Sequence, residues 1–100
     1  MKNALKDKKE IDRLFATGKS VSNGIIAIKW VESSDSKILF AVSSSTFKRA
    51  VDRNRIKRLM RESVKGLTFT NKSIAIIYRE KTIKSFNEVK DSIIKLSEKI

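Results

Sequence analysis

The spacing of hydrophobic residues changes along the chain, and the first regular spacing is helical. Ile11, Leu14 and Phe15 recur at intervals of three and four residues, which places them on one face of a helix. Gly18 follows this group and is typical of the position where a helix ends. The first element predicted from the sequence is therefore a short amphipathic helix.

The next two hydrophobic segments have the character of strands. Residues 21–31 alternate, so that Ile26, Ile28 and Trp30 point to one face of a sheet. Residues 38–42 (ILFAV) form a compact hydrophobic run after a polar turn. We expect these two segments to pair as a hairpin.

The second half of the chain shows a helix, a strand and another helix. A helical period extends to residue 65, polar residues 43–46 are expected to cap this helix, and Gly66 follows its end. The run IAIIY at residues 74–78 predicts a strand buried on both faces. Ser85 and Glu88 form a capping box for a final helix. The hydrophobic stripe of that helix consists of Phe86, Val89, Ile93, Leu96 and Ile100.

The predicted order is helix, strand, strand, helix, strand, helix. An α+β fold, in which helices pack on one sheet, buries all of these hydrophobic faces. One hundred residues suffice for one such domain. No hydrophobic run approaches the roughly 20 residues that span a bilayer, and none follows lysine-rich residues 1–10, so neither a membrane segment nor a signal peptide is expected.

Composition narrows the range of functions. The chain has 23 Lys and Arg against 11 Asp and Glu, and a net charge of +12 favours a polyanionic partner. Cysteine and histidine are both absent, which excludes a disulfide, a thiolate nucleophile, a Cys/His zinc site and an imidazole base. Missing cysteine also suits a reducing cytoplasm.

The positive charge is concentrated in residues 48–61. These fourteen residues contain seven basic side chains and one acid, Asp52. Like charges at helical spacing repel one another, so this pattern favours a partner over helix stability. Arginine predominates here, and its guanidinium group binds phosphate with two hydrogen bonds and stacks on bases. Asn54 can both donate to and accept from a base edge or a ribose hydroxyl.

Two alternative roles for this segment are less favoured. A solvated amphipathic helix with no ligand would have the same period but gains nothing from excluding acids. A membrane-surface helix would need aromatic anchors on its hydrophobic face, and that face is needed for the core.

Residues 50–62, with the sequence AVDRNRIKRLMRE, closely resemble the AVxRNRxKRxxRE signature of the protein subunit of bacterial ribonuclease P. Residues 11–18 (IDRLFATG) resemble the N-terminal helix of that family, and residues 38–44 resemble the strand before the signature. The resemblance covers nearly the whole chain, as one RNA-binding domain of residues 1–100. It implies a two-layer sandwich with a mixed sheet, in which a parallel strand–helix–strand connection has an unusual left-handed crossover.

The resemblance implies that the catalyst is an RNA, which removes the 5′ leader of precursor tRNA, and that the polypeptide assists it. The implied partners are the catalytic RNA and precursor tRNA, with the protein as a monomer in a 1:1 cytoplasmic ribonucleoprotein. Mg²⁺ would be bound mainly by the RNA, with no organic cofactor and no catalytic or metal-binding side chain in the protein. The positions expected to bind RNA are Lys48, Arg49, Arg53, Asn54, Arg55, Lys57, Arg58 and Arg61.

The family also holds the single-stranded leader in a cleft between the first helix and the sheet. The matching positions are Ile11, Phe15 and Lys29, although Ile11 and Phe15 are equally compatible with ordinary core packing. Many family members have a lysine pair and a glycine before the signature, where this chain has Ser44-Ser45-Thr46-Phe47-Lys48-Arg49. Lys48 and Arg49 are expected to supply the missing charge.

Two other functions share some of these features. A ribosomal or RNA-chaperone module would have a similar composition and would bind RNA without assisting cleavage. A protein-only nuclease would cleave RNA without an RNA cofactor, but the absent histidine and scattered acids disfavour it.

Overall fold

The structure is a computed structural model that describes residues 3–4, 8–34, 36–67 and 69–100. Asp35 in the expected turn, Thr68, and residues 1–2 and 5–7 of the lysine-rich segment lie outside the described residues. The elements are β1 (Asn3–Ala4), α1 (Lys8–Thr17), β2 (Lys19–Ser22), β3 (Ile26–Glu32), β4 (Lys37–Ala41), α2 (Ala50–Ser63), β5 (Lys72–Tyr78) and α3 (Phe86–Ser97).

The five strands form one mixed sheet in the order β1-β4-β5-β3-β2. β4 and β5 are parallel, whereas β3 runs antiparallel to β5. The expected hairpin between residues 21–31 and 38–42 is therefore wrong, because β5 lies between β3 and β4. The hydrophobic run of β5 accounts for its position, since a strand buried on both faces belongs at the centre of a sheet. The α+β class and the mixed sheet are confirmed.

Residues 21–31 were expected to form one strand but contribute to two, β2 and β3, joined by a tight turn. The side-chain oxygen of Asn23 accepts hydrogen bonds from the backbone N–H groups of Ile25 and Ile26, both at 2.9 Å. Gly24 follows Asn23, and Asn-Gly is a strong turn signal. The two-residue strand β1, parallel to β4, was also not expected.

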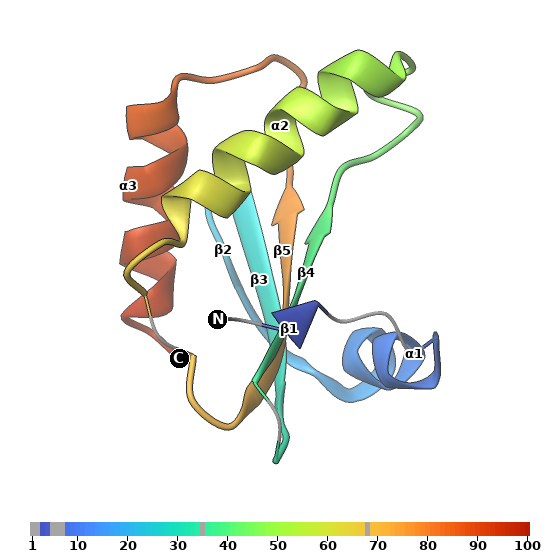
Figure 1. The fold of residues 1–100 in the computed structure, drawn as a ribbon, viewed down its shortest axis with the longest axis vertical. Coiled ribbons are helices and arrows are strands. Elements are labelled where there is room, and N and C mark those ends of the chain that lie inside the picture. The colour runs from blue at the N-terminus through green and yellow to red at the C-terminus, as the bar shows by residue number, and fades with distance from the viewer. Residues whose placement is uncertain (1–2, 5–7, 35, 68) are drawn as a thin grey trace.

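The connection from β4 through α2 to β5 has the left-handed crossover that the resemblance implied. In Figure 1 both strands run upward behind α2, and β5 lies to the left of β4. A right-handed connection with the helix in front would place the second strand to the right. α2 and α3 thus cover one face of the sheet, whereas α1 lies apart from them (Figure 1).

The main hydrophobic core lies between the sheet and the pair α2 and α3. Its fully buried members come from β3, β5 and both helices: Ile26, Ile28, Ile56, Met60, Ile74, Ile76, Val89 and Ile93. A second, smaller cluster on the other face joins Leu14 of α1 to Ala75 of β5. Among the described residues no helix is long and hydrophobic enough to cross a membrane.

Gly18 follows the last residue of α1, at a position that leaves no room for a side chain. A Cβ atom at this position would lie 2.3 Å from the carbonyl oxygen of Leu14 and 3.1 Å from that of Trp30. The Gly18 N–H also donates to the Leu14 carbonyl at 2.9 Å. The end of the helix therefore lies close to the backbone of β3.

Candidate nucleic-acid interface

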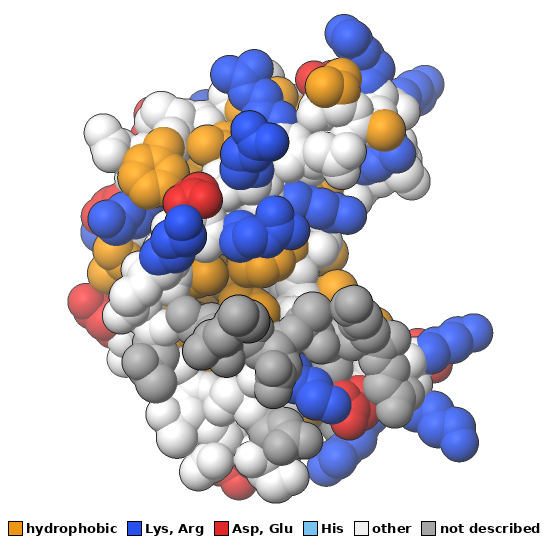
Figure 2. Space-filling view, in the orientation of Figure 1, with side chains coloured by type: hydrophobic (Ala, Val, Ile, Leu, Met, Phe, Trp, Pro, Cys, Tyr) orange, Lys and Arg blue, Asp and Glu red, His pale blue; other side chains and the backbone are white. Residues whose placement is uncertain are grey.

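The hydrophobic residues of α2 hold the helix on the sheet and turn its basic face outward. Ile56, Met60 and Ser63 are buried, and the Ser63 hydroxyl donates to the Leu59 carbonyl. Basic side chains gather over α2 in the space-filling view (Figure 2). We define the basic ridge as the eight positions predicted to bind RNA. Lys48, Arg49, Asn54, Arg55, Arg58 and Arg61 are exposed, whereas Arg53 and Lys57 are half-buried.

Acidic side chains of the described residues do not neutralise the ridge. The ion pairs in this part of the chain join Lys37 to Glu10, Lys65 to Glu62, Lys84 to Glu80 and Lys95 to Asp91. None of these four pairs includes a ridge residue. The signature contains two acids, Asp52 and Glu62. Glu62 lies 2.9 Å from Lys65 at the far end of the helix, and Asp52 belongs to none of the four pairs. The positive charge of the ridge therefore remains available to an anion from outside.

Arg53 differs from the rest of the ridge because its guanidinium group turns back onto the chain. Its Nη1 atom donates to the carbonyl oxygens of Phe47 at 2.8 Å and Lys48 at 3.0 Å. Arg61 instead lies with its guanidinium carbon 5.8 Å from the centre of the Phe40 ring on β4. The exposed guanidinium group of Arg61 therefore makes a cation–π contact with a ring of the sheet.

The segment before α2 does not cap the helix as expected. Ser43 instead stabilises a turn of residues 43–47. Its hydroxyl accepts a hydrogen bond from the Thr46 N–H at 3.4 Å, and its carbonyl accepts one from the Phe47 N–H at 3.0 Å. The residue at the N-cap is Arg49, whose side chain makes no capping hydrogen bond. The capping prediction was wrong because the intervening residues 47–49 carry the chain away from residues 43–46.

On the opposite face of the sheet, α1 places two of the predicted cleft residues together. Phe15 is 39% exposed, and the Nζ atom of Lys29 lies 5.6 Å from the centre of its ring. Leu14, the neighbour of Phe15, is fully buried and anchors the helix. Ile11 is half-buried and packs against the Leu14 cluster, so it supports the helix more than it faces solvent.

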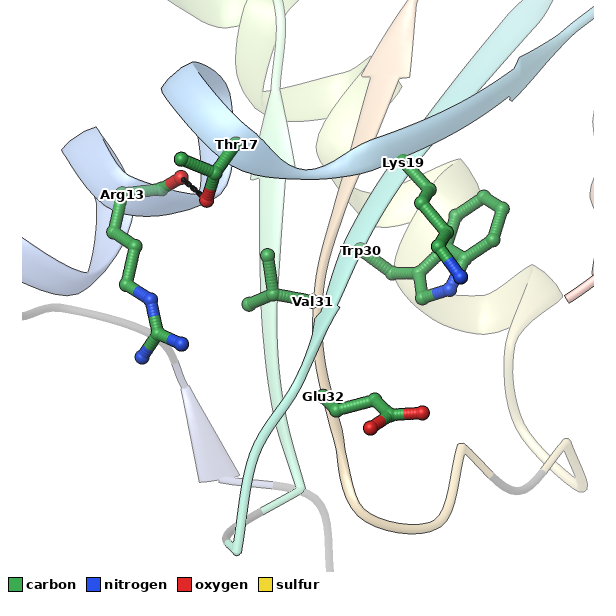
Figure 3. A pocket seen from close by; sticks show the side chains of 6 residues that line it. All are labelled: Arg13, Thr17, Lys19, Trp30, Val31 and Glu32. Atoms are coloured by element: carbon green, nitrogen blue, oxygen red, sulfur yellow. Dashed lines mark hydrogen bonds between the residues drawn. The ribbon is translucent and has the colours of Figure 1, made fainter.

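A shallow pocket of about 310 Å³ opens beside the C-terminal end of α1. Figure 3 shows its lining, in which Arg13 and Thr17 of α1 stand across from Val31, while Lys19 and Trp30 lie beside each other on β2 and β3. Glu32 completes the lining. Sequence reasoning missed this pocket. The single tryptophan and the nearby Arg13 and Lys19 were the available signals, but they come from three elements.

The described residues contain no group of three or more acidic, cysteine or histidine side chains that could hold a metal ion. Tyr78 has a pKa raised above its ordinary value of 10.0, mainly because burial disfavours the phenolate. A tyrosine held protonated in this way supports the fold rather than proton transfer. The exposed cations of the basic ridge are suited to binding anionic groups.

A family model described as ribonuclease P matches residues 1–100. The chain is similar to the ribonuclease P protein of Thermotoga maritima, with a TM-score of 0.85 and 22% identity over 99% of this chain and 98% of that one. A mutant ribonuclease P protein of Staphylococcus aureus gives a TM-score of 0.82 and 24% identity over 95% and 85%. No curated protein matches at a significant level. The family match over the full length shows that this chain belongs to the ribonuclease P protein family.

Proposed function

We propose that this ribonuclease P protein works through two surfaces on opposite faces of its sheet. The basic ridge binds the catalytic RNA, and the cleft beside α1 holds the single-stranded 5′ leader of precursor tRNA. The protein thereby assists the RNA-catalysed cleavage that produces the mature 5′ end of tRNA. The observation that carries this proposal is that the exposed cations of the ridge form no ion pair with an acid of the described residues.

The physical argument for the ridge is electrostatic. RNA carries one negative charge per nucleotide, and each cation that neutralises a phosphate releases a condensed counterion. Arg55, Arg58 and Arg61 recur at intervals of three residues and therefore lie along one side of α2. Arginine can hold a phosphate with two hydrogen bonds, and Asn54 beside it offers a donor and an acceptor to a base edge or a ribose hydroxyl.

The surface around Phe15 and Lys29 suits a single strand better than a duplex. An unpaired base can stack on the exposed ring of Phe15, a contact worth about 1–3 kcal/mol. Lys29 beside that ring can contact the adjoining phosphate. A duplex has its bases stacked inside and cannot offer a base face to one phenylalanine.

The catalytic step and its Mg²⁺ ions are assigned to the RNA. The sequence has no histidine or cysteine, and the described acids do not cluster. The protein then contributes charge and position, as a monomer in a 1:1 cytoplasmic ribonucleoprotein without an organic cofactor.

Reconstitution tests the proposal. The protein is mixed with ribonuclease P RNA and precursor tRNA at low Mg²⁺, and the 5′ product is measured with and without the protein. We expect faster cleavage with wild type and a reduced gain with Arg58→Ala. Binding without faster cleavage would instead support a general RNA-binding module, and cleavage without any RNA subunit would indicate a protein-only nuclease.

A further inference from the structure

The start of α2 is held in an unusual way. Helices commonly begin with Ser, Thr, Asp or Asn, whose side chain accepts a hydrogen bond from the first turn. Here the N-cap is Arg49, with φ −83° and ψ 129°, and it makes no such bond. The hydroxyls of Ser43 and Ser45 are 2.7 Å from each other and serve their own turn. Something else must fix the backbone that leads into the helix.

Arg53 supplies that restraint from within the helix. Helical side chains lean toward the N-terminus, so a long side chain one turn into α2 can reach the residues that precede it. The Nη1 atom of Arg53 donates to two consecutive carbonyl oxygens, those of Phe47 and Lys48. Hydrogen bonds from a charged donor are about twice as strong as neutral ones. One guanidinium group therefore holds two successive peptide units.

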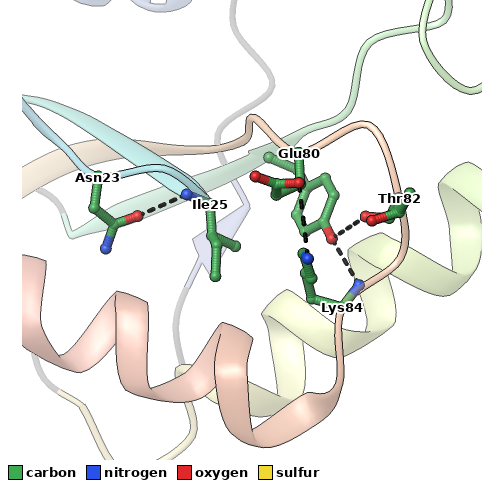
Figure 4. Close-up of polar contacts among 6 residues, drawn as sticks. Asn23, Ile25, Glu80, Thr82 and Lys84 are labelled. Carbon is green, nitrogen blue, oxygen red and sulfur yellow. Dashed lines mark hydrogen bonds and ion pairs between the residues drawn. The ribbon is translucent and has the colours of Figure 1, made fainter.

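The same segment is fixed from its other side by an aromatic contact. Phe47 is only 8% exposed, and its ring centre lies 5.9 Å from that of Tyr78. The Tyr78 hydroxyl donates to the Thr82 carbonyl at 2.6 Å and accepts from the Lys84 N–H at 2.9 Å. Figure 4 labels both hydrogen-bond partners, Thr82 and Lys84. Phe47 is thus anchored on the end of β5.

Lys48 and Arg49 lie between these restraints and the first turn of α2. Both side chains are exposed, and neither has an acidic partner among the ion pairs of the described chain. The direction in which they point therefore depends on the backbone of residues 47–49. Whatever fixes this backbone also fixes where two cations meet the RNA.

We propose that Arg53 is a positioning residue of the RNA interface. It acts by holding residues 47–49, so that Lys48 and Arg49 present their charges to the RNA, rather than by a phosphate contact of its own. This inference rests on the proposed RNA-binding function of the ridge. Arg53 would thus act indirectly, whereas the exposed side chains of Arg55 and Arg58 would contact the RNA directly.

A double-mutant cycle on ribonuclease P RNA binding tests the inference. Arg53→Ala is measured in the wild-type chain and in a Lys48→Ala/Arg49→Ala chain. We expect it to weaken binding about tenfold in the wild type and less than about twofold in the second background, because the side chains it positions are gone. Arg58→Ala, the matched control, is expected to weaken binding by a similar factor in both.

Hydrogen exchange in the free protein tests whether the hydrogen bonds from Arg53 hold residues 47–49. The Phe47 N–H donates to the Ser43 carbonyl at 3.0 Å, so its hydrogen exchange reports order just before α2. We expect faster exchange at Phe47 in Arg53→Ala and no change in Arg58→Ala. If Arg53→Ala folds poorly, Arg53→Met takes its place in both measurements, since it keeps the aliphatic stem and removes the donors.

The outcomes separate the two claims. Normal RNA binding by both Arg58→Ala and the Lys48→Ala/Arg49→Ala chain would overturn the proposed function of the ridge. If those variants bind weakly but Arg53→Ala keeps its full effect without Lys48 and Arg49, Arg53 contacts the RNA directly and the positioning role is wrong. Unchanged affinity in Arg53→Ala, or unchanged exchange at Phe47, would also overturn it.

Discussion

The two faces of the sheet are built for different tasks. One face is covered by α2 and α3 and carries the larger core, with Ile28, Ile74 and Ile76 fully buried. Among the described elements, only α1 crosses the other face, where the buried cluster consists of Leu14 and Ala75. A face sealed by two helices supplies stability, whereas a face crossed by one helix leaves side chains open to a ligand. Phe15, exposed next to buried Leu14, marks that boundary.

This difference follows from alternation along the strands. Side chains of successive residues point to opposite faces, so Ile28 and Ile76, which pair across β3 and β5, share the α2 and α3 face. The neighbouring pair, Lys29 and Ala75, belongs to the α1 face. Alanine at the centre lets α1 lie close to the sheet, and lysine beside it keeps that face polar.

The largest expected effect is on the sealed face. Ile76→Ala removes a fully buried side chain from the central strand and leaves a cavity, at a cost of about 3–4 kcal/mol in free energy of unfolding. Urea unfolding measures the loss. RNA affinity of the folded protein should not change, because the ridge lies on the outer side of α2. A loss below about 1 kcal/mol would contradict the role of this face as the main source of stability.

Leu14→Ala makes the matching change on the open face. We expect a loss of about 2–3 kcal/mol, at the lower end for a buried leucine, because one helix can settle toward the cavity. Leader binding should weaken as well, since α1 also carries Phe15. A stability loss equal to that of Ile76→Ala, with unchanged leader binding, would remove the distinction between the faces.

Phe15 and Phe86 provide a matched pair of exposed rings. They are 39% and 38% exposed, and a lysine Nζ lies 5.6 and 5.7 Å from the respective ring centre. Phe15→Ala should weaken binding of a single-stranded leader oligonucleotide by about 1–3 kcal/mol, whereas Phe86→Ala on α3 should leave it unchanged. Fluorescence anisotropy measures both. Equal losses would mean that exposed rings bind RNA wherever they lie, and the cleft would lose its special role.

Much of this arrangement was predictable from local sequence. Hydrophobic periods located all three helices, and the Ser85 cap is confirmed by a 3.3 Å hydrogen bond from the Glu88 N–H. The exposure of most of the ridge followed from the position of Ile56 and Met60 on the other side of α2. Phe15 and Lys29 were expected in one cleft from the family resemblance, and the structure brings them together.

The parts that were missed depend on contacts distant in sequence. The local sequence does not predict that β5 lies between β3 and β4, because strand pairing depends on contacts across the whole sheet. Arg53 lies at the edge of the hydrophobic arc, and its inward turn depends on carbonyl groups five and six residues earlier. Asn23-Gly24 was a readable turn signal that the long alternation around it obscured.

Tyr78 makes the sealed face sensitive to high pH. Burial raises its pKa above 10.0, so the folded protein holds the phenol protonated more strongly than the unfolded chain does. The stability that results is complete below pH 10 and is lost as the pH rises through the folded pKa. Tyr78→Phe should cost about 1 kcal/mol at pH 7 through lost hydrogen bonds, and the difference from wild type should narrow above pH 10. A difference that widens there would mean that the phenolate is favoured by folding.

The smallest effect is expected at the ion pair that ties α1 to β4. Lys37 Nζ lies 3.2 Å from Glu10 Oε2, and both side chains keep access to water. Exposed pairs of this kind contribute about 0–1 kcal/mol and weaken in salt. Glu10→Gln should therefore lower stability by less than about 1 kcal/mol at low salt and by nothing measurable at about 1 M salt. A larger loss of stability that persists at high salt would show that the ion pair is the main contact holding α1 on the sheet. A small loss that disappears in salt would instead leave the burial of Leu14 as the main contact.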